Sequence, residues 1–396
     1  MTPTGGLRAI PTADRAWLIA ALGDALNGGA PVLPVSGDAD ETVIAALQAA
    51  PLPTGTALVL RTSGSTGVPK AVALSAGALR ASAEATHERL GGPGQWLVAL
   101  PAHLISGLQM LVRSALSGID PVFYDGPFDP AGLLRAAEKM EAERRYVSLV
   151  PVQLSRLLDL AERDSDAADA LRAFDAVLVG GQAVSLQLRR RCHDLGVALK
   201  RSYGMSETAG GCVYDGVEIG DTRVRIREGE VQLAGPSLAL GYVGDAALTA
   251  DRFVLHENRD GTLTRWYRTG DAGELLGGML TVTGRLDRVI VSGGVNVSLD
   301  EVERVVREAA GIESVVAVGA PHPEWGERVV LVVEAATPPA AVPAVEAARA
   351  ALRERLGAAA VPDRVVEMEQ LPRLAGGKVD LRALAESVRA HEGAHE

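Results

Sequence analysis

A loop near the start of the chain carries the residue types that bind polyphosphates. The segment 62–70 reads Thr-Ser-Gly-Ser-Thr-Gly-Val-Pro-Lys and follows the apolar run 57–60, a predicted buried strand. Its hydroxyls can donate hydrogen bonds, its glycines let backbone N–H groups approach a ligand, and its lysine adds a positive charge. Pro69 stands where a Walker A motif requires glycine, so the segment is not that motif. An ordinary surface turn is the alternative for the segment alone.

Five further segments carry side chains that could take part in the same chemistry. They are 101–107 with His103, 203–208 with Ser206 and Glu207, 267–271 with Asp271, 284–288 with Arg285 and Asp287, and 372–378 with Lys378. Taken singly, most have an ordinary explanation, since histidine often serves in packing and aspartate beside glycine often caps a turn. Glu207 is harder to explain in this way, because a carboxylate just after a parallel strand is well placed to hold Mg²⁺.

Up to about residue 200, short apolar runs alternate with amphipathic segments. The predicted helices are 130–145, 151–160 and 184–195, and the predicted buried strands are 57–60, 146–150, 176–179 and 196–200. This alternation predicts mostly parallel sheets covered by helices. Ligands of such sheets bind beyond the carboxyl ends of the strands, where Gly180, Gly181 and the segment 203–208 fall.

The pattern changes between residues 213 and 285, where short runs are separated by recurring glycines. The segment 222–227 alternates strictly, and 230–234 follows it as a second short run. Such alternation predicts an antiparallel sheet or a small β-barrel-like part. We expect this part to complete a large N-terminal domain over 1–286.

A compact α+β pattern begins after residue 287. Ser298 and Glu301 form a capping box for a predicted helix over 299–310, which Gly311 is placed to end. The further predicted elements are strands over 314–318 and 328–334 and a helix over 345–356.

The alanine- and proline-rich stretch 335–345 is expected to be a surface loop, with an interdomain linker as the alternative. The chain is therefore predicted to be an α/β protein in which a small, mobile α+β C-terminal domain spans 287–396 and carries Lys378.

Composition narrows the class of protein. The 396 residues carry a formal charge of −11, which disfavours nucleic acid and anionic membranes as partners. Cys192 and Cys212 form no disulfide framework, which fits a reducing cytoplasm. The N-terminus lacks a signal peptide, and the uncharged part of 90–112 contains prolines and glycines that argue against a spanning helix. We expect a soluble cytoplasmic enzyme, with self-association into a homo-oligomer left open.

The six segments in this order resemble the adenylate-forming acyl-CoA synthetase superfamily, and the resemblance covers nearly the whole chain. It implies a two-step reaction in which a carboxylic acid and ATP form acyl-AMP, and CoA then takes the acyl group. ATP, Mg²⁺ and CoA are the implied cofactors and co-substrates. Within the superfamily, the short length and the segments 83–92 and 101–113 are most similar to the 2-succinylbenzoate–CoA ligase family of menaquinone biosynthesis.

The resemblance implies a role for each matched residue. The β- and γ-phosphates of ATP are implied ligands of Thr62, Ser63, Gly64, Ser65, Thr66, Gly67 and Lys70. Tyr203 is the implied partner of adenine, Ser206 that of the α-phosphate and Glu207 that of Mg²⁺. Asp271 and Arg285 are implied to bind the ribose hydroxyls. Asp287 matches the hinge, and Lys378 matches the lysine that bridges the carboxylate and the α-phosphate; His103 is the third candidate catalytic residue.

The acyl pocket is less well defined by the sequence. A dicarboxylic acid needs a cation or hydrogen-bond donors at its far end, and the candidates are Arg201, Ser106 and Gln109, with Gly180 and Gly181 lining the pocket. Three positions depart from the usual pattern. Ala71 replaces a glycine, Ser206 replaces a threonine, and Ala102 stands where an aromatic residue often precedes the histidine.

Elementary chemistry agrees with these roles. A carboxylate is a poor acyl donor because its leaving group would be oxide, whereas the mixed anhydride with AMP can be attacked by a thiol. Lys378 can supply the cation that brings the two anions together, and Ser206 can donate to the α-phosphate. The lysine must then leave so that CoA can enter, which a pivot at Asp287 would permit.

Two alternative functions stay open at this point. One is an acyl-adenylating enzyme of other specificity, either an aryl- or fatty-acyl-CoA ligase or an enzyme that charges a carrier protein. The other is a catalytically silent nucleotide-binding regulator. Because a silent protein has no need of Lys378, Glu207 and Asp271 together, the regulator is disfavoured.

Overall fold

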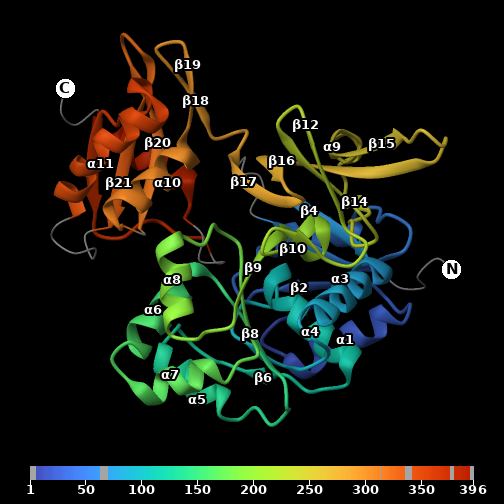
Figure 1. Cartoon of the computed structure of the whole chain (residues 1–396). Coiled ribbons are helices and arrows are strands. Elements are labelled where there is room, and N and C mark those ends of the chain that lie inside the picture. Colours follow the sequence, from blue (N-terminus) through green and yellow to red (C-terminus); the bar gives the residue numbers. More distant parts are fainter. Residues whose placement is uncertain (1–5, 63–69, 313, 335–340, 375–378, 393–396) are drawn as a thin grey trace.

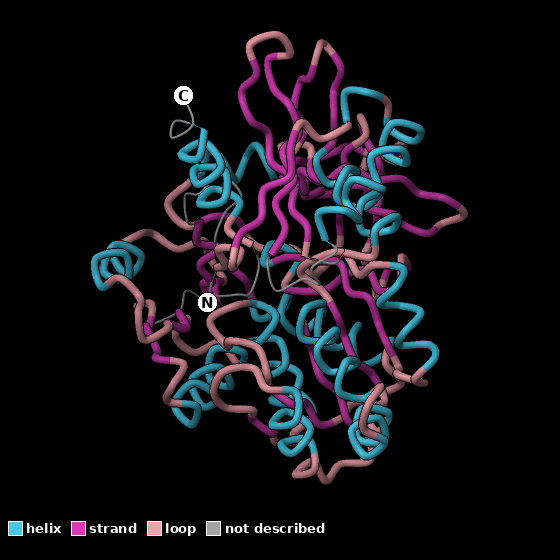
Figure 2. The backbone as a smooth tube through the Cα atoms, turned by 90° about the vertical axis from the view of Figure 1, so that its left-hand side faces the viewer, coloured by secondary structure: helices cyan, strands magenta, loops and turns pink. Residues whose placement is uncertain are grey.

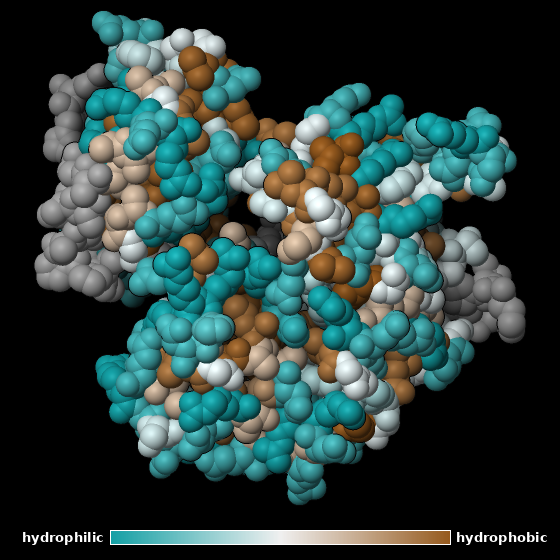
Figure 3. All heavy atoms as spheres, viewed as in Figure 1, coloured by the Kyte–Doolittle hydropathy of each residue, from teal (hydrophilic) through white to brown (hydrophobic). Residues whose placement is uncertain are grey.

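The computed structural model describes residues 6–62, 70–312, 314–334, 341–374 and 379–392. Figure 1 shows one larger body up to β17 (Met279–Arg285) and a smaller one from β18 (Val289–Ser292) onward. In the space-filling view, a recess separates the two bodies beside this junction (Figure 3). The fold is the predicted α/β class, with a large N-terminal and a smaller C-terminal domain.

The first sheet of the large domain positions the expected phosphate loop. Its strands, in spatial order, are β1 (Arg8–Pro11), β2 (Val32–Val35), β3 (Thr56–Thr62), β4 (Lys70–Ser75) and β14 (Gly241–Tyr242). β1 to β3 are parallel, while β4 runs antiparallel to both β3 and β14. Helices α1 (Arg15–Leu26) and α3 (Ala76–Arg89) pack on one face and α2 (Glu41–Ala49) on the other. Thr62 and Lys70 are partners across β3 and β4, so the loop between them begins and ends at one point of the sheet.

The second sheet is the helix-covered parallel sheet that the alternating pattern predicts. Its strands, in spatial order, are β11 (Val217–Glu218), β10 (Gly210–Tyr214), β9 (Leu199–Met205), β8 (Ala176–Val179), β7 (Arg145–Leu149), β5 (Gln95–Val98) and β6 (Val122–Phe123). The strands from β9 to β6 are parallel, and β10 and β11 are antiparallel additions at one edge.

Helices cover both faces of this second sheet, as Figure 2 shows. α3 and α4 (Ile105–Ser117) share one apolar core with it, and the other core contains α5 (Pro130–Ala137), α6 (Pro151–Ala161), α7 (Ser165–Arg172) and α8 (Leu186–Asp194). Side chains alternate between the two cores along β8, where Val177 and Val179 face one and Ala176 and Leu178 the other. The parallel strands are therefore buried on both sides, which explains their continuous apolar sequence.

The helix expected over 130–145 is shorter than predicted, because α5 ends at Ala137. The side-chain oxygen of Gln95 accepts hydrogen bonds from the backbone N–H groups of Glu141 and Ala142, at 2.8 and 3.2 Å. A residue distant in sequence thus binds two N–H groups that a continuing helix would need for its own hydrogen bonds.

The strand expected over 196–200 lies further along the chain, as β9 from Leu199 to Met205. Gly196 has a φ of 70°, and Val197 N–H donates to the carbonyl of Cys192 at 2.8 Å, so these residues belong to the turn that ends α8. As a result, Tyr203 lies within the strand rather than after it.

The third sheet of the large domain is the antiparallel sheet predicted after residue 213. It contains β12 (Arg223–Arg227), β13 (Glu230–Ala234), β16 (Leu263–Leu276), β15 (Phe253–Glu257) and β17, with α9 (Ala246–Arg252) before β15. Of the two alternatives, the described pairings form an open sheet, in which the long strand β16 pairs with β13, β15 and β17. Asp271 and Arg285 are direct partners in the β16–β17 pair.

The smaller domain has its own sheet and core. Its elements are β18, β19 (Val295–Ser298), α10 (Leu299–Ala310), β20 (Val315–His322), β21 (Gly326–Glu334), α11 (Ala341–Leu356), β22 (Arg364–Met368) and α12 (Leu381–Glu392). The strand order is β19-β18-β21-β20, with β22 parallel to β21. Both predicted ends of α10 are confirmed, since Ser298 Oγ accepts from Glu301 N–H at 3.4 Å and Gly311 has a φ of 69°.

The predicted loop 335–345 is partly wrong, because α11 begins at Ala341 rather than at residue 345. Residues 335–340 lie outside the described part. Pro343 falls in the first turn of α11, where its missing N–H costs no hydrogen bond, so this proline does not delay the helix. Among the described residues, we find no helix with the length and apolar character needed to cross a membrane.

Candidate active site

Glu207 lies at the centre of the described part of the site. It belongs to a short 3₁₀ helix, Ser206–Thr208, that follows β9. The Thr208 hydroxyl accepts from Met205 N–H at 3.0 Å and donates to the carbonyl of Gly210 at 2.7 Å, which closes this turn on both sides. Ser206 is half-buried at the start of the turn. The chain direction thus changes sharply where the α-phosphate and metal residues are expected.

The carboxylate of Glu207 is buried and lacks a cation in the described part of the chain, where no ion pair includes it. Its Oε1 accepts a hydrogen bond from the hydroxyl of Tyr242 at 2.9 Å. Burial, with Glu207 adding to it, raises the pKa of Tyr242, so the phenol stays protonated and donates. A buried anion with a neutral partner fits a metal cation, and Mg²⁺ commonly takes one or two protein carboxylates together with phosphate oxygens.

Lys70 also approaches this point. Its ammonium lies 5.8 Å from the centre of the Tyr242 ring, because β4 pairs with both β3 and β14. Ser63, Gly64, Ser65, Thr66 and Gly67 lie outside the described residues, but the two ends of their loop, Thr62 and Lys70, leave the sheet beside Tyr242. The expected phosphate loop and the expected metal ligand are thus brought to the same edge of the structure.

Tyr242 was not among the residues selected from the sequence. The signal that could have identified it is weak, since a tyrosine after glycine in a short strand has many explanations. Tyr242→Phe is expected to raise the Mg²⁺ concentration needed for half-maximal activity about tenfold, because loss of a hydrogen bond to a metal-binding carboxylate typically weakens metal binding by that order. Titrating Mg²⁺ at saturating ATP measures the effect, and an unchanged requirement would contradict it.

Tyr203, Asp271 and Arg285 form the second group of expected nucleotide ligands. Tyr203 OH donates to Asp271 Oδ2 at 2.7 Å, and Arg285 Nη1 lies 3.2 Å from Asp271 Oδ1. Burial raises the pKa of Asp271, while the hydrogen bond from Tyr203 and the charge of Arg285 oppose that rise. Arg285 also binds both carboxylate oxygens of Asp287, at 2.9 Å each. Residues far apart in sequence thus meet where the ribose and the hinge are expected.

A buried arginine, Arg113 of α4, is the other feature that the sequence reading missed. It is 3% exposed, lies over the ring of Trp96 at 4.7 Å, and donates to Thr86 Oγ1 at 3.2 Å. Since Thr86 Oγ1 donates to the carbonyl of Ser82, it accepts the 2.9 Å hydrogen bond from Tyr214 OH. The ion pairs found in the described residues do not include Arg113, and burial lowers its pKa. A buried cation without a carboxylate indicates a binding place for an anion.

His87 lies next to this arginine and adds no second charge. Burial, and to a smaller extent Arg113, lowers the pKa of His87 to about 4, so the imidazole is neutral at pH 7. An arginine within an apolar helix segment (Met110 to Val112 precede it) is the sequence signal that could have identified Arg113. Most arginines at such positions turn to the surface, so burial had to be seen in the structure.

A small hollow lies between α3, β10 and the loop after β13. Ser82, Gly211, Cys212 and Ser237 are among its lining residues. Ser82 Oγ and Gln109 Nε2 both donate to the carbonyl of Ala209, at 2.8 and 2.6 Å. With a volume of about 10 Å³, the hollow has room for about one water molecule, and Arg113 is not among its lining residues.

The other expected substrate residues are placed differently. Gln109 is buried with its amide bound as above, whereas Ser106, one turn earlier on α4, is exposed. Arg201 already has a counter-ion, since its Nε lies 3.3 Å from Asp215 Oδ1. Gly180 directly follows β8, and a Cβ there would lie 2.9 Å from the carbonyl oxygen of Ser202, so the glycine permits a close approach of the two chains. Gly181 has a φ of 80°, which favours glycine.

The two remaining candidate catalytic residues, His103 and Lys378, are less closely defined. His103 is half-buried before α4; burial lowers its pKa, and the charge of Asp38 opposes that shift more than Arg61 reinforces it. It is therefore mostly neutral at pH 7. Lys378 lies outside the described residues, and its role stays a prediction.

Comparison with known proteins identifies the class to which this fold and site belong. Residues 19–243 match the model of the AMP-binding enzyme family, and residues 301–378 match that of the AMP-binding enzyme C-terminal domain. The chain belongs to the AMP-binding enzyme family, which confirms the predicted AMP-forming ligase class.

Particular relatives narrow the comparison. The chain is 38% identical over 378 residues to the probable 2-succinylbenzoate–CoA ligase of Mycobacterium tuberculosis, covering 93% of this chain and 94% of that protein. It is 31% identical to the 2-succinylbenzoate–CoA ligase of Listeria monocytogenes, covering 83% and 70%.

Solved structures agree in fold. The o-succinylbenzoate CoA synthetase (MenE) of Bacillus subtilis in complex with ATP and magnesium ion has a TM-score of 0.76 at 22% identity, covering 97% of this chain and 90% of that one. The same enzyme in complex with the acyl-adenylate intermediate OSB-AMP has a TM-score of 0.74 at 22% identity, covering 97% and 88%.

Proposed function

We propose that this protein is the 2-succinylbenzoate–CoA ligase of menaquinone biosynthesis, which forms acyl-AMP from 2-succinylbenzoate and ATP and transfers the acyl group to CoA. The relatives at 31 and 38% identity support the substrate. The structural observation that supports this substrate is the buried guanidinium of Arg113, which has no carboxylate partner in the described part of the chain. A substrate with a second carboxylate can provide one.

The described residues suit the first half-reaction. Glu207, held by Tyr242, can bind Mg²⁺, and Lys70 can bind the outer phosphates. Bound Mg²⁺ would neutralise phosphate charge. Tyr203, Asp271 and Arg285 can bind the nucleoside, and Ser206 can donate to the α-phosphate. Lys378 would bring the substrate carboxylate against that phosphate, where opposite charge offsets the repulsion of two anions.

The second half-reaction requires CoA to reach the acyl-AMP. We place the boundary between the domains at residues 286 and 287, with Asp287 as the pivot that lets Lys378 leave. The position of Asp287 between β17 and β18 supports this assignment. The two buried free cysteines support a cytoplasmic location. A homo-oligomer stays a prediction.

A panel of acids tests the proposed substrate. The purified protein is given ATP, Mg²⁺ and CoA with 2-succinylbenzoate, with a mono-acid analogue that keeps the carboxylate to be adenylated but lacks the second one, and with a fatty acid. We expect kcat/KM for 2-succinylbenzoate to exceed that of the mono-acid analogue about 100-fold, the effect of one charge-assisted contact in a buried site. CoA-dependent release of AMP measures each rate. Preference for a mono-acid would favour another aryl- or fatty-acyl-CoA ligase, and AMP release that needs a carrier protein would favour that alternative.

A further inference from the structure

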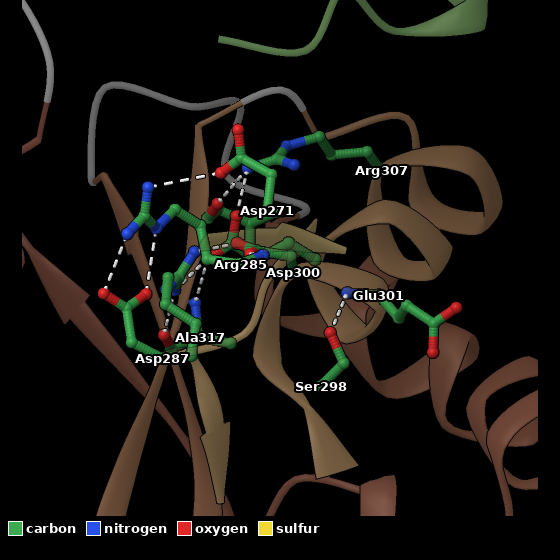
Figure 4. A network of polar contacts seen from close by, with 11 residues as sticks. Asp271, Arg285, Asp287, Ser298, Asp300, Glu301, Arg307 and Ala317 are labelled. Atoms are coloured by element: carbon green, nitrogen blue, oxygen red, sulfur yellow. Dashed lines mark hydrogen bonds and ion pairs between the residues drawn. The ribbon is translucent and has the colours of Figure 1, made fainter. Parts of the chain in front are cut away.

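The junction between the domains contains one continuous chain of polar contacts (Figure 4). On the side of the large domain, Arg285 joins Asp271, the expected ribose ligand, to Asp287, the expected pivot. Its guanidinium is therefore shared between the nucleoside site and the start of the smaller domain. The direction in which that side chain points depends on the position of its own main chain.

Asp300, in the first turn of α10, holds that main chain. Its Oδ2 accepts a hydrogen bond from the backbone N–H of Arg285 at 2.7 Å. Its Oδ1 pairs with Arg288, which also binds Glu303 Oε1 at 2.7 Å and the carbonyl of Ala317 at 2.8 Å. Oδ2 of Asp300 thus contacts the large domain, and Oδ1 contacts the smaller one. Ala317 is fully buried in the sheet of the smaller domain.

Asp300 is also closely packed against β17, the strand that carries Arg285. A Cβ at Gly284 would lie 2.8 Å from the Cβ of Asp300 and 3.2 Å from Ser298 Oγ. Since Gly284 directly precedes Arg285 in β17, the start of α10 lies against the strand that carries the arginine. A larger residue at position 284 would have to push Asp300 away.

We propose that Asp300 is a positioning residue of the nucleoside site, which couples ribose binding at Asp271 and Arg285 to the placement of the smaller domain. The proposal rests on the proposed function in assigning a ribose to these two residues. Asp300 itself does not touch the nucleotide. It acts by fixing the main chain of Arg285, so that the guanidinium is already directed at Asp271 when the nucleotide arrives. Coupling of this kind is reciprocal, so a bound ribose also favours the domain placement in which the contact is formed.

The test compares two nucleotides in the absence of any acid. Dissociation constants of ATP and of 2′,3′-dideoxy-ATP, each with Mg²⁺, are measured by calorimetry on the full-length protein. We expect the wild type to bind ATP about tenfold more tightly than the dideoxy analogue, the effect of hydrogen bonds to a charged group. Asp300→Ala is expected to weaken ATP about tenfold and the analogue less than about twofold, so that the discrimination is lost.

Two further variants make the outcome specific. Gly284→Ala keeps the carboxylate but displaces it, and is expected to lose the same discrimination. Glu301→Ala removes a charge from the same turn of α10 without a contact to Arg285, and is expected to behave as the wild type. Equal weakening of both nucleotides by Asp300→Ala would show a merely structural role and overturn the proposal. Unchanged discrimination in that variant, or none in the wild type, would overturn it as well.

This test is independent of the acyl substrate. If the acid panel shows a different substrate while Asp300→Ala still loses discrimination, the substrate assignment fails and the positioning role stands. If 2-succinylbenzoate is activated but the discrimination is unaffected, the positioning role fails and the substrate assignment stands.

Discussion

Lys378→Ala is expected to slow the formation of acyl-AMP about 10²–10³-fold, the scale on which removing one charge-stabilising donor acts. The reason is that two anions, the substrate carboxylate and the α-phosphate, must meet during adenylation. The residue stands in the sequence Gly376-Gly377-Lys378, at the end of the segment that matches the C-terminal domain of the family. Acid-dependent exchange of pyrophosphate into ATP measures this step.

The same variant should still convert supplied acyl-AMP and CoA to the thioester at close to the wild-type rate, because that step needs the lysine to be absent. Lys139→Ala, at an exposed position, is the matched control and should leave both steps unchanged. Equal loss of both half-reactions in Lys378→Ala would contradict the assigned role and indicate a structural or shared one.

Arg113→Met is expected to raise KM for 2-succinylbenzoate about 10- to 100-fold and to leave KM for the mono-acid analogue nearly unchanged, because only the diacid has a second carboxylate for Arg113 to bind. Methionine keeps much of the volume of arginine and removes its charge. Since Arg113 is buried and lacks a carboxylate partner among the described residues, its replacement should not lower the free energy of unfolding. Steady-state kinetics and urea unfolding provide the two measurements.

Arg201→Met is the comparison that separates the two candidate arginines. Arg201 is half-exposed and pairs with Asp215, so its removal should affect the diacid and the mono-acid analogue alike. A selective loss of diacid binding in Arg201→Met, with none in Arg113→Met, would restore the expectation drawn from the sequence and remove Arg113 from the pocket.

The two arginines show why the acyl pocket was harder to predict than the nucleotide site. The expected nucleotide-binding residues occur in short segments with characteristic glycines and hydroxyls, such as 62–70 and 203–208. In the proposed function, the far end of the acyl pocket depends instead on whether one arginine is buried and one is paired. Both properties arise from contacts across long stretches of chain, such as that of Arg113 with Thr86.

Elements determined by neighbouring residues could be predicted closely. The strand 176–179 and the strand 230–234 have the predicted bounds, as does the helix 299–310 between its serine cap and its glycine end. Their signals are an apolar run, an alternation or a cap, and each acts over a few residues. Two of the predictions that were wrong, the helix 130–145 and the strand 196–200, involve segments whose backbone groups bond elsewhere.

The sequence by itself determined the class of reaction, because the hydroxyls, glycines, acids and lysine expected to bind ATP follow one another in a recognisable order. The tertiary structure alone decided which of these groups are neighbours. It brings Tyr242 to Glu207 across 35 residues and Tyr203 to Asp271 across 68, and it places Asp300 of the smaller domain on the main chain of Arg285. Hydrogen bonds and burial depend on distances in space, and pairs so far apart in the chain leave no local pattern from which those distances can be read.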